Sequence, residues 1–191
     1  IEGLKGALAI RDLGDPADFA TDIGPIIDIE AKAALDGYVI HLKTTAKILK
    51  ELKPGVSAPL LFGPVMAEIR LDQLPDREVF GPILHVIRYR SQELEKACKA
   101  VAEKGYGLTL GIHSRLASFA ERVRALVPAG NTYVNRSMIG AVVGVQPFGG
   151  EGLSGTGPKA GGPYSLTRYA VERSISVNIA AQGGDPALLN S

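Results

Sequence analysis

Cysteine and net charge are both scarce in this sequence. The 191 residues contain one cysteine, Cys98, so no disulfide can form within the chain, and this fits a reducing compartment such as the cytoplasm. Lys and Arg number 21 against 20 Asp and Glu, which gives a formal net charge of +1. A balance this close to zero gives no reason to expect nucleic acid or an anionic membrane surface as a partner.

Long apolar runs are also missing. The longest, such as Ile139–Val145, are far shorter than the roughly 20 residues that a membrane-spanning helix needs, so no transmembrane segment is predicted. No signal-like segment precedes the first helical pattern. The first residue is Ile1 rather than Met, and we expect that the chain begins within a larger polypeptide.

The hydrophobic pattern predicts alternating helices and strands. The composition, 46% hydrophobic and 21% charged, is typical of one globular domain. Apolar residues at helical spacing predict helices over 1–8, ended by Gly14-Asp15-Pro16, and over 29–42, 92–103 and 116–126. Short apolar runs flanked by Gly or Pro predict strands at 62–69, 83–89, 108–113 and 131–134. This order predicts an α/β domain with a mostly parallel sheet covered by helices on both faces.

Glycines are crowded between Gly140 and Tyr164. Ordinary connections run about 4 to 6 residues, so a stretch this long predicts a ligand-facing loop. A short helical piece is expected over 164–170. Beyond it Ile175, Val177 and Ile179 alternate with polar residues, which predicts a half-buried strand at the edge of a sheet.

Two common kinds of functional site do not fit. A phosphate-binding P-loop needs Gly-Lys followed by Ser or Thr, but Lys159 stands between Pro158 and Ala160. The three histidines, His41, His85 and His113, have no metal-like spacing and no cysteine or carboxylate cluster beside them. We therefore expect surface or packed histidines and no metal site.

The single cysteine could be a nucleophile or a core residue. Leu94, Ala97, Cys98 and Val101 recur at the spacing of one helical face. A cysteine on such a face is typically buried and inert, so the pattern favours the core.

Four motifs in order resemble the aldehyde dehydrogenase family. They are "EVFGP" (78–82), "YGLTLGIHSR" (106–115), "AGNTYVNRS" (129–137) and "QPFGGEGLSGTG" (146–157). Over 135–169 the sequence is similar to the branch that oxidises glutamate semialdehyde, and most like the C-terminal part of the bifunctional bacterial enzymes called proline utilization A. The resemblance implies part of an aldehyde dehydrogenase catalytic domain.

The resemblance assigns the cofactor NAD⁺ to Glu78 and Phe80. In the family, the glutamate at this motif position accepts hydrogen bonds from both hydroxyls of the nicotinamide ribose, and the phenylalanine packs near the nicotinamide ring. A carboxylate has two acceptor oxygens and suits a vicinal diol. The alternative is a solvated acid beside Asp76 and Arg77 at the start of a strand.

The resemblance also assigns the glycine-rich stretch to the substrate. It implies that the backbone N–H groups of Gly140 and Ala141 hold the α-carboxylate of glutamate γ-semialdehyde, and that Phe148 forms an aromatic wall of the aldehyde pocket. Small residues let the main chain approach an anion closely. The alternative is a flexible connector.

The family reaction needs a cysteine that this chain does not supply. A thiolate attacks the aldehyde, a hydride passes to NAD⁺, and water releases the acid, here L-glutamate. Cys98 does not stand at the nucleophile's place in the family, so no catalytic residue is expected in this chain and the isolated chain should be inactive. FAD is expected only if a proline dehydrogenase domain precedes.

The resemblance divides the chain at residue 170. Residues 1–170 would belong to the catalytic domain, and 171–191 to an oligomerisation strand, Glu172 to Ile179, and a tail. The expected partners are the rest of the parent polypeptide and further copies of it. Two alternatives remain open here, a dehydrogenase for another aldehyde and a noncatalytic assembly module.

Overall fold

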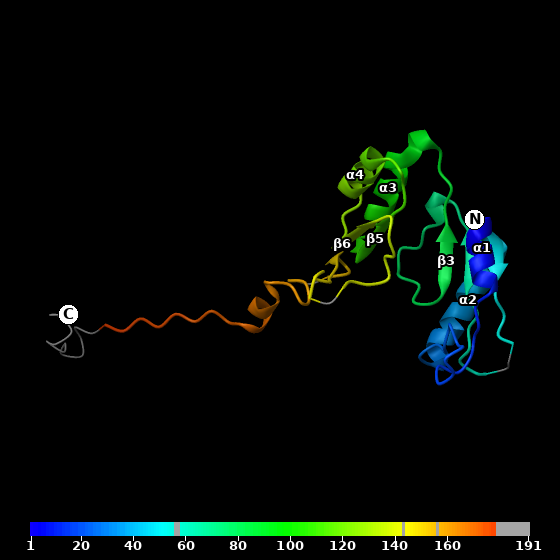
Figure 1. The fold of residues 1–191 in the computed structure, drawn as a ribbon, viewed down its shortest axis with the longest axis horizontal. Coiled ribbons are helices and arrows are strands. Elements are labelled where there is room, and N and C mark those ends of the chain that lie inside the picture. The colour runs from blue at the N-terminus through cyan, green and yellow to red at the C-terminus, as the bar shows by residue number, and fades with distance from the viewer. Residues whose placement is uncertain (56–57, 143, 156, 179–191) are drawn as a thin grey trace. The chain divides into compact units, whose positions relative to one another are not determined.

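The computed structural model describes residues 1–55, 58–142, 144–155 and 157–178 (Figure 1). The chain divides into two compact units. The first unit comprises Ile1–Tyr106 and Ser114–Pro128, and the second comprises Gly107–His113 and the segment from Ala129 onward. Each is described in turn.

Two helices begin the first unit. Helix α1 (Glu2–Ala9) has no buried residue; it ends before Ile10, so the predicted stop at Gly14 to Pro16 is wrong by several residues. Helix α2 (Ile29–Thr45) begins where predicted, because Oδ1 of Asp28 accepts a hydrogen bond of 2.7 Å from the N–H of Ala31. This satisfies one of the donors that a helix start leaves without a backbone partner.

A three-stranded sheet follows in the order β1-β2-β3. Strand β1 (Lys47–Glu51) pairs antiparallel with β2 (Val65–Glu68), and β2 pairs parallel with β3 (Ile83–Val86). The strands predicted at 62–69 and 83–89 are confirmed as shorter elements. Strand β1 was not predicted, because its sequence KILKE offers only two apolar residues among charged ones.

Helix α2 packs on this sheet. Leu35 and Val39 of α2 form a buried cluster with Phe62 and Val65, and Leu42, one turn later, packs with a second cluster that includes Ala67. Spacings of four and three residues place the helical side chains on one face, and alternate residues of β2 point to that face. Burial of these apolar groups fixes α2 against β2 and β3.

Two further helices complete the first unit. Helix α3 (Leu94–Ala102) follows the 3₁₀ turn η2 (Ser91–Glu93), and α4 (Ala117–Leu126) lies beside it (Figure 1). Arg122 of α4 forms an ion pair of 2.6 Å with Glu95 of α3. Leu94, Ala97 and Cys98 are buried as predicted, but Val101 is 40% exposed, so the predicted apolar face of this helix ends one turn earlier.

The second unit is built on a parallel pair of strands. Strand β5 (Thr109–Ile112) pairs with β6 (Asn131–Val134), with Thr109 opposite Asn131. Strand β7 (Glu151–Gly152) of this unit pairs with the very short β4 (Tyr106–Gly107), of which Gly107 belongs to this unit. The helical piece predicted at 164–170 is a 3₁₀ helix, η3 (Ser165–Tyr169).

The prediction of one mostly parallel sheet needs correction. Within the described residues the strands form three separate sheets, and the pair β1-β2 is antiparallel. Local periodicity identifies a strand but does not name its partner, which is chosen by contacts distant in the sequence. Helices on both faces and the division at residue 170 stay predictions.

The predicted edge strand is not observed as a strand among the described residues. Residues 172–178 are extended without strand pairing, while Ile179, its last predicted residue, lies outside the described residues. A strand exists only through its neighbour, so pairing with a second copy stays a prediction.

Candidate functional site

The predicted cofactor residues lie on a loop that leads into β3. Along Glu78-Val79-Phe80 the middle side chain packs against the first core cluster, whereas Glu78 is exposed and Phe80 is 81% exposed. This is the two-residue alternation of an extended chain. One apolar residue faces inward, and the carboxylate and the aromatic ring are both displayed to solvent.

Three contacts hold this loop in place. The N–H of Val65 donates to the carbonyl of Pro82 at 3.0 Å. Gly81 lies so close to helix α2 that an added Cβ would be 2.5 Å from Cδ2 of Leu35. Asp76 forms an ion pair with Lys104, and the hydrogen bond from Lys104 lowers the pKa of this carboxyl group. The loop is therefore anchored on both sides of Glu78.

The carboxylate of Glu78 has no partner among the described residues. Within the ranges described above, it makes no hydrogen bond or ion pair. Both of its oxygens can therefore accept from one vicinal diol. Two residues further on, the exposed ring of Phe80 offers a flat apolar face. The cofactor role of this pair stays a prediction.

The predicted carboxylate anchor lies between β6 and a tight turn. In the part of the chain that the structure describes, no hydrogen bond engages the N–H of Gly140 or Ala141. Just beyond them, Oε1 of Gln146 accepts from the N–H of Val142 at 3.1 Å, and the backbone N–H of Gln146 donates to the carbonyl of Val142 at 2.8 Å. The N–H groups of Gly140 and Ala141 therefore have no acceptor among the described residues, and their role as a carboxylate anchor stays a prediction.

Among the described residues, no atom lies where the side chain of a residue larger than glycine would begin at position 140. A Cβ added to Gly140 would meet no atom within 4 Å, and Gly140 is not among the glycines with positive φ. Neither packing within this unit nor backbone strain therefore requires glycine here.

Phe148 is half-buried, and both of its backbone groups are hydrogen-bonded to Ala160. Its N–H donates to the carbonyl of Ala160 at 3.1 Å, and the N–H of Ala160 donates back at 3.0 Å. The buried side chain of Asn131 bonds to the backbone of Pro147 and Gly149. Asn131 was not among the predicted site residues. The available signal was a polar carboxamide at the start of a strand that was expected to be buried.

The structure divides the predicted residues between its units. Glu78 and Phe80 belong to the first unit, and Gly140, Ala141 and Phe148 belong to the second. Each set is held by contacts within its own unit.

Cys98 and the three histidines were not expected to form a functional site. Burial raises the pKa of the Cys98 thiol, so the reactive thiolate is disfavoured, and the core assignment of this cysteine is confirmed. His41 and His113 are exposed, and His85 is packed against Tyr38. The described residues contain no group of three or more His, Cys, Asp or Glu placed to hold a metal ion.

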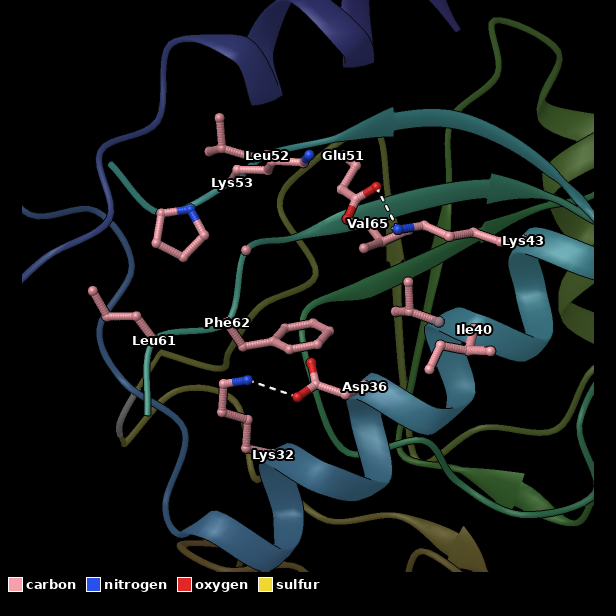
Figure 2. A pocket seen from close by; sticks show the side chains of 13 residues that line it. Lys32, Asp36, Ile40, Lys43, Glu51, Leu52, Lys53, Leu61, Phe62 and Val65 are labelled. Atoms are coloured by element: carbon pink, nitrogen blue, oxygen red, sulfur yellow. Dashed lines mark hydrogen bonds and ion pairs between the residues drawn. The ribbon is translucent and has the colours of Figure 1, made fainter. Parts of the chain in front are cut away.

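A pocket of about 350 Å³ lies elsewhere, between α2 and the end of β1 (Figure 2). Two ion pairs cross its walls, Lys32 with Asp36 at 2.6 Å and Lys43 with Glu51 at 3.0 Å, and the ring of Phe62 points between them. The charges of these two pairs compensate one another, and Lys53 adds a further positive charge to the lining. None of the predicted cofactor or substrate residues lines it.

No helix among the described residues is both long and apolar enough to cross a membrane.

Comparison with known proteins identifies related sequences. The model of the aldehyde dehydrogenase family matches residues 1–175. The chain is 42% identical over 200 residues to the bifunctional protein PutA of Klebsiella aerogenes, covering 97% of this chain and 15% of PutA. It is 34% identical to a 1-pyrroline-5-carboxylate dehydrogenase of Geobacillus sp. (strain WCH70), covering 86% of this chain and 32% of that enzyme.

Solved structures give the same result. A crystal structure of a proline utilization A (PutA) mutant from Bradyrhizobium japonicum superimposes with a TM-score of 0.84 at 50% sequence identity. The match covers 95% of this chain and 19% of that one. The chain thus spans about a sixth of the length of these PutA relatives.

Proposed function

This chain belongs to the aldehyde dehydrogenase family, and from that premise we propose that it is the C-terminal part of an NAD-dependent dehydrogenase of proline catabolism. The parent enzyme would oxidise L-glutamate γ-semialdehyde, the open form of 1-pyrroline-5-carboxylate, to L-glutamate. The observation that carries the proposal is the similarity of almost the whole chain to PutA, together with its similarity to separate 1-pyrroline-5-carboxylate dehydrogenases.

Glu78 and Phe80, both exposed on the first unit, would hold the cofactor. When bound, NAD⁺ would accept the hydride that leaves the aldehyde carbon. The free carboxylate of Glu78 would take the two hydroxyls of the nicotinamide ribose in charge-assisted hydrogen bonds. Phe80, exposed beside it, would limit where the nicotinamide ring can lie.

The loop on the second unit would hold the substrate. Glutamate semialdehyde carries an α-carboxylate that simple aldehydes lack. The backbone N–H groups of Gly140 and Ala141, which have no acceptor among the described residues, can donate to such an anion. Phe148 would supply the aromatic wall beside the carbon chain.

The nucleophile would come from outside these 191 residues. The chain has one cysteine, and Cys98 is buried in a helix with a raised pKa. A thiol in that position is neither accessible to an aldehyde nor ionised for attack. The isolated chain should therefore bind parts of the cofactor and substrate without turnover.

The rest of the parent polypeptide and a second copy of it are the proposed partners. Val171, Ile175 and Val177 are exposed on the terminal segment, where a neighbouring sheet edge would cover them. FAD would belong to a proline dehydrogenase domain elsewhere in a bifunctional parent. The proposed location is the cytoplasm.

Enlarging the anchor tests the substrate assignment. In the full-length enzyme, Ala141→Leu should raise KM for pyrroline-5-carboxylate by about tenfold or more, since loss of a charged hydrogen bond costs roughly 1.5–3 kcal/mol. KM for an aliphatic aldehyde without a carboxylate, measured by NADH formation, is the control and should change little. An unchanged KM for pyrroline-5-carboxylate would contradict the assignment.

A further inference from the structure

Asn131 is the buried polar residue among the described core positions, with 9% of its surface exposed. It begins β6, and its own N–H donates to the carbonyl of Leu108 at 3.1 Å. Its backbone is therefore bonded to the residue that precedes β5, the neighbouring strand of the parallel pair. A buried carboxamide destabilises the folded protein unless its donor and acceptor groups are hydrogen-bonded. Both groups of Asn131 have partners.

Those partners are the two residues that flank Phe148. Nδ2 of Asn131 donates to the carbonyl of Pro147 at 3.0 Å, and Oδ1 accepts from the N–H of Gly149 at 3.2 Å. One amide plane thus binds the main chain immediately before and immediately after Phe148. Such a bracket requires one donor and one acceptor on the same short side chain, which asparagine provides.

The surrounding backbone reinforces this bracket. Gly130 lies against the loop so closely that an added Cβ would be 1.9 Å from the carbonyl oxygen of Gly149. The ammonium group of Lys159 donates to the carbonyl of Gly130, and the next residue, Ala160, pairs with Phe148. Phe148 is consequently held from the strand on one side and from the 159–160 segment on the other.

We propose that Asn131 is a positioning residue for the aldehyde pocket, which acts by fixing the backbone on both sides of Phe148. The inference rests on the proposed function in taking Phe148 as the pocket wall, and it adds a residue that touches neither substrate nor cofactor. An aromatic wall selects a substrate only while its position is fixed, because a displacement of about 1 Å is enough to lose a productive geometry.

Three variants of the full-length enzyme test the role. Asn131→Leu keeps the branched shape and the number of side-chain heavy atoms and removes both hydrogen bonds, so KM for pyrroline-5-carboxylate should rise about tenfold while KM for NAD⁺ changes less than about twofold. Hydrogen exchange of a peptide over 146–150 should become faster. Thr132→Val, the loss of a hydroxyl on the neighbouring residue, is the control and should change none of these.

Asn131→Asp adds a readout that a general packing role would not show. Ionised aspartate accepts from Gly149 but repels the carbonyl of Pro147, whereas protonated aspartate again offers one donor and one acceptor. The ratio of KM in this variant to KM in the wild type should therefore shrink as the pH falls. Because protonation restores the bracket, this measurement remains informative if Asn131→Leu does not fold.

A double-mutant cycle separates this inference from the proposed function. Phe148→Ala alone should raise KM for pyrroline-5-carboxylate, and Asn131→Leu added to it should have little further effect. No effect of Phe148→Ala would overturn the pocket assignment itself. An effect of Phe148→Ala with additive effects of the pair, or a pH-independent ratio for Asn131→Asp, would overturn the positioning role alone.

Discussion

The hydroxyl of Tyr38 on α2 lies 2.9 Å from Nε2 of His85 on β3, and the two rings meet nearly edge to face at 85°. This pair crosses from helix to sheet beside the core that supports the Glu78 loop. Burial lowers the pKa of His85 from its usual value of 6.5 and raises that of Tyr38. At neutral pH both groups are uncharged.

This pair predicts a dependence of stability on pH. Below 6.5 the unfolded chain binds a proton at His85 that the folded chain resists, so the free energy of unfolding should fall as the pH drops through that value. Thermal unfolding of the full-length protein at neutral and acidic pH should show a smaller loss in His85→Gln than in the wild type. The exposed His41→Gln is the control; equal losses in both variants would contradict the prediction.

Glu78→Gln should weaken cofactor use without loss of folding. Glutamine keeps one acceptor and loses the charge, and the difference between charged and neutral hydrogen bonds, about 1 kcal/mol, corresponds to a rise in KM for NAD⁺ of about fivefold. The melting temperature should not change, because the side chain is exposed. Glu30→Gln, the same change at an exposed glutamate outside the loop, is the matched control. An unchanged KM for NAD⁺ would leave Glu78 as a solvated acid.

Gly81→Ala should both destabilise the protein and disturb the cofactor loop. Its methyl group would overlap Leu35, and overpacking of a core costs roughly 1–3 kcal/mol. Leu35→Val should relieve part of this cost in the double variant, which chemical unfolding can measure as a coupling energy.

Gly37→Ala is the control for that change. A Cβ on Gly37, in the middle of α2, would meet no atom within 4 Å, so alanine should stabilise the helix by about 0.5–1 kcal/mol. Equal effects at both glycines would refute the steric argument.

The terminal segment should hold copies of the parent together. Ile175 and Val177 are 88% and 58% exposed, and replacing both by lysine should abolish their burial against a neighbour. We expect a lower mass by light scattering. Lysine at the alternate positions Ser174 and Ser176 should be tolerated better, and an unchanged mass after the first pair of changes would remove the oligomerisation role.

The sequence by itself determined the elements that local periodicity encodes. The apolar pattern over 29–42 predicted α2, and Asn131–Val134 was predicted as a strand with its observed bounds. The family motifs around Glu78 and Gly140 could also be recognised, because each is a contiguous stretch of sequence and its recognition does not depend on how the chain folds.

Only the tertiary structure decided which distant segments support those motifs. Strand β1 is defined by its pairing with β2. Gly81 cannot be enlarged because Leu35 lies against it. The role proposed for Asn131 depends on hydrogen bonds to residues sixteen and eighteen positions away in the sequence. Periodicity reports which way a side chain faces along its own element. Hydrogen-bond partners and close approaches between elements depend on packing over long sequence separations, and that information lies in the fold.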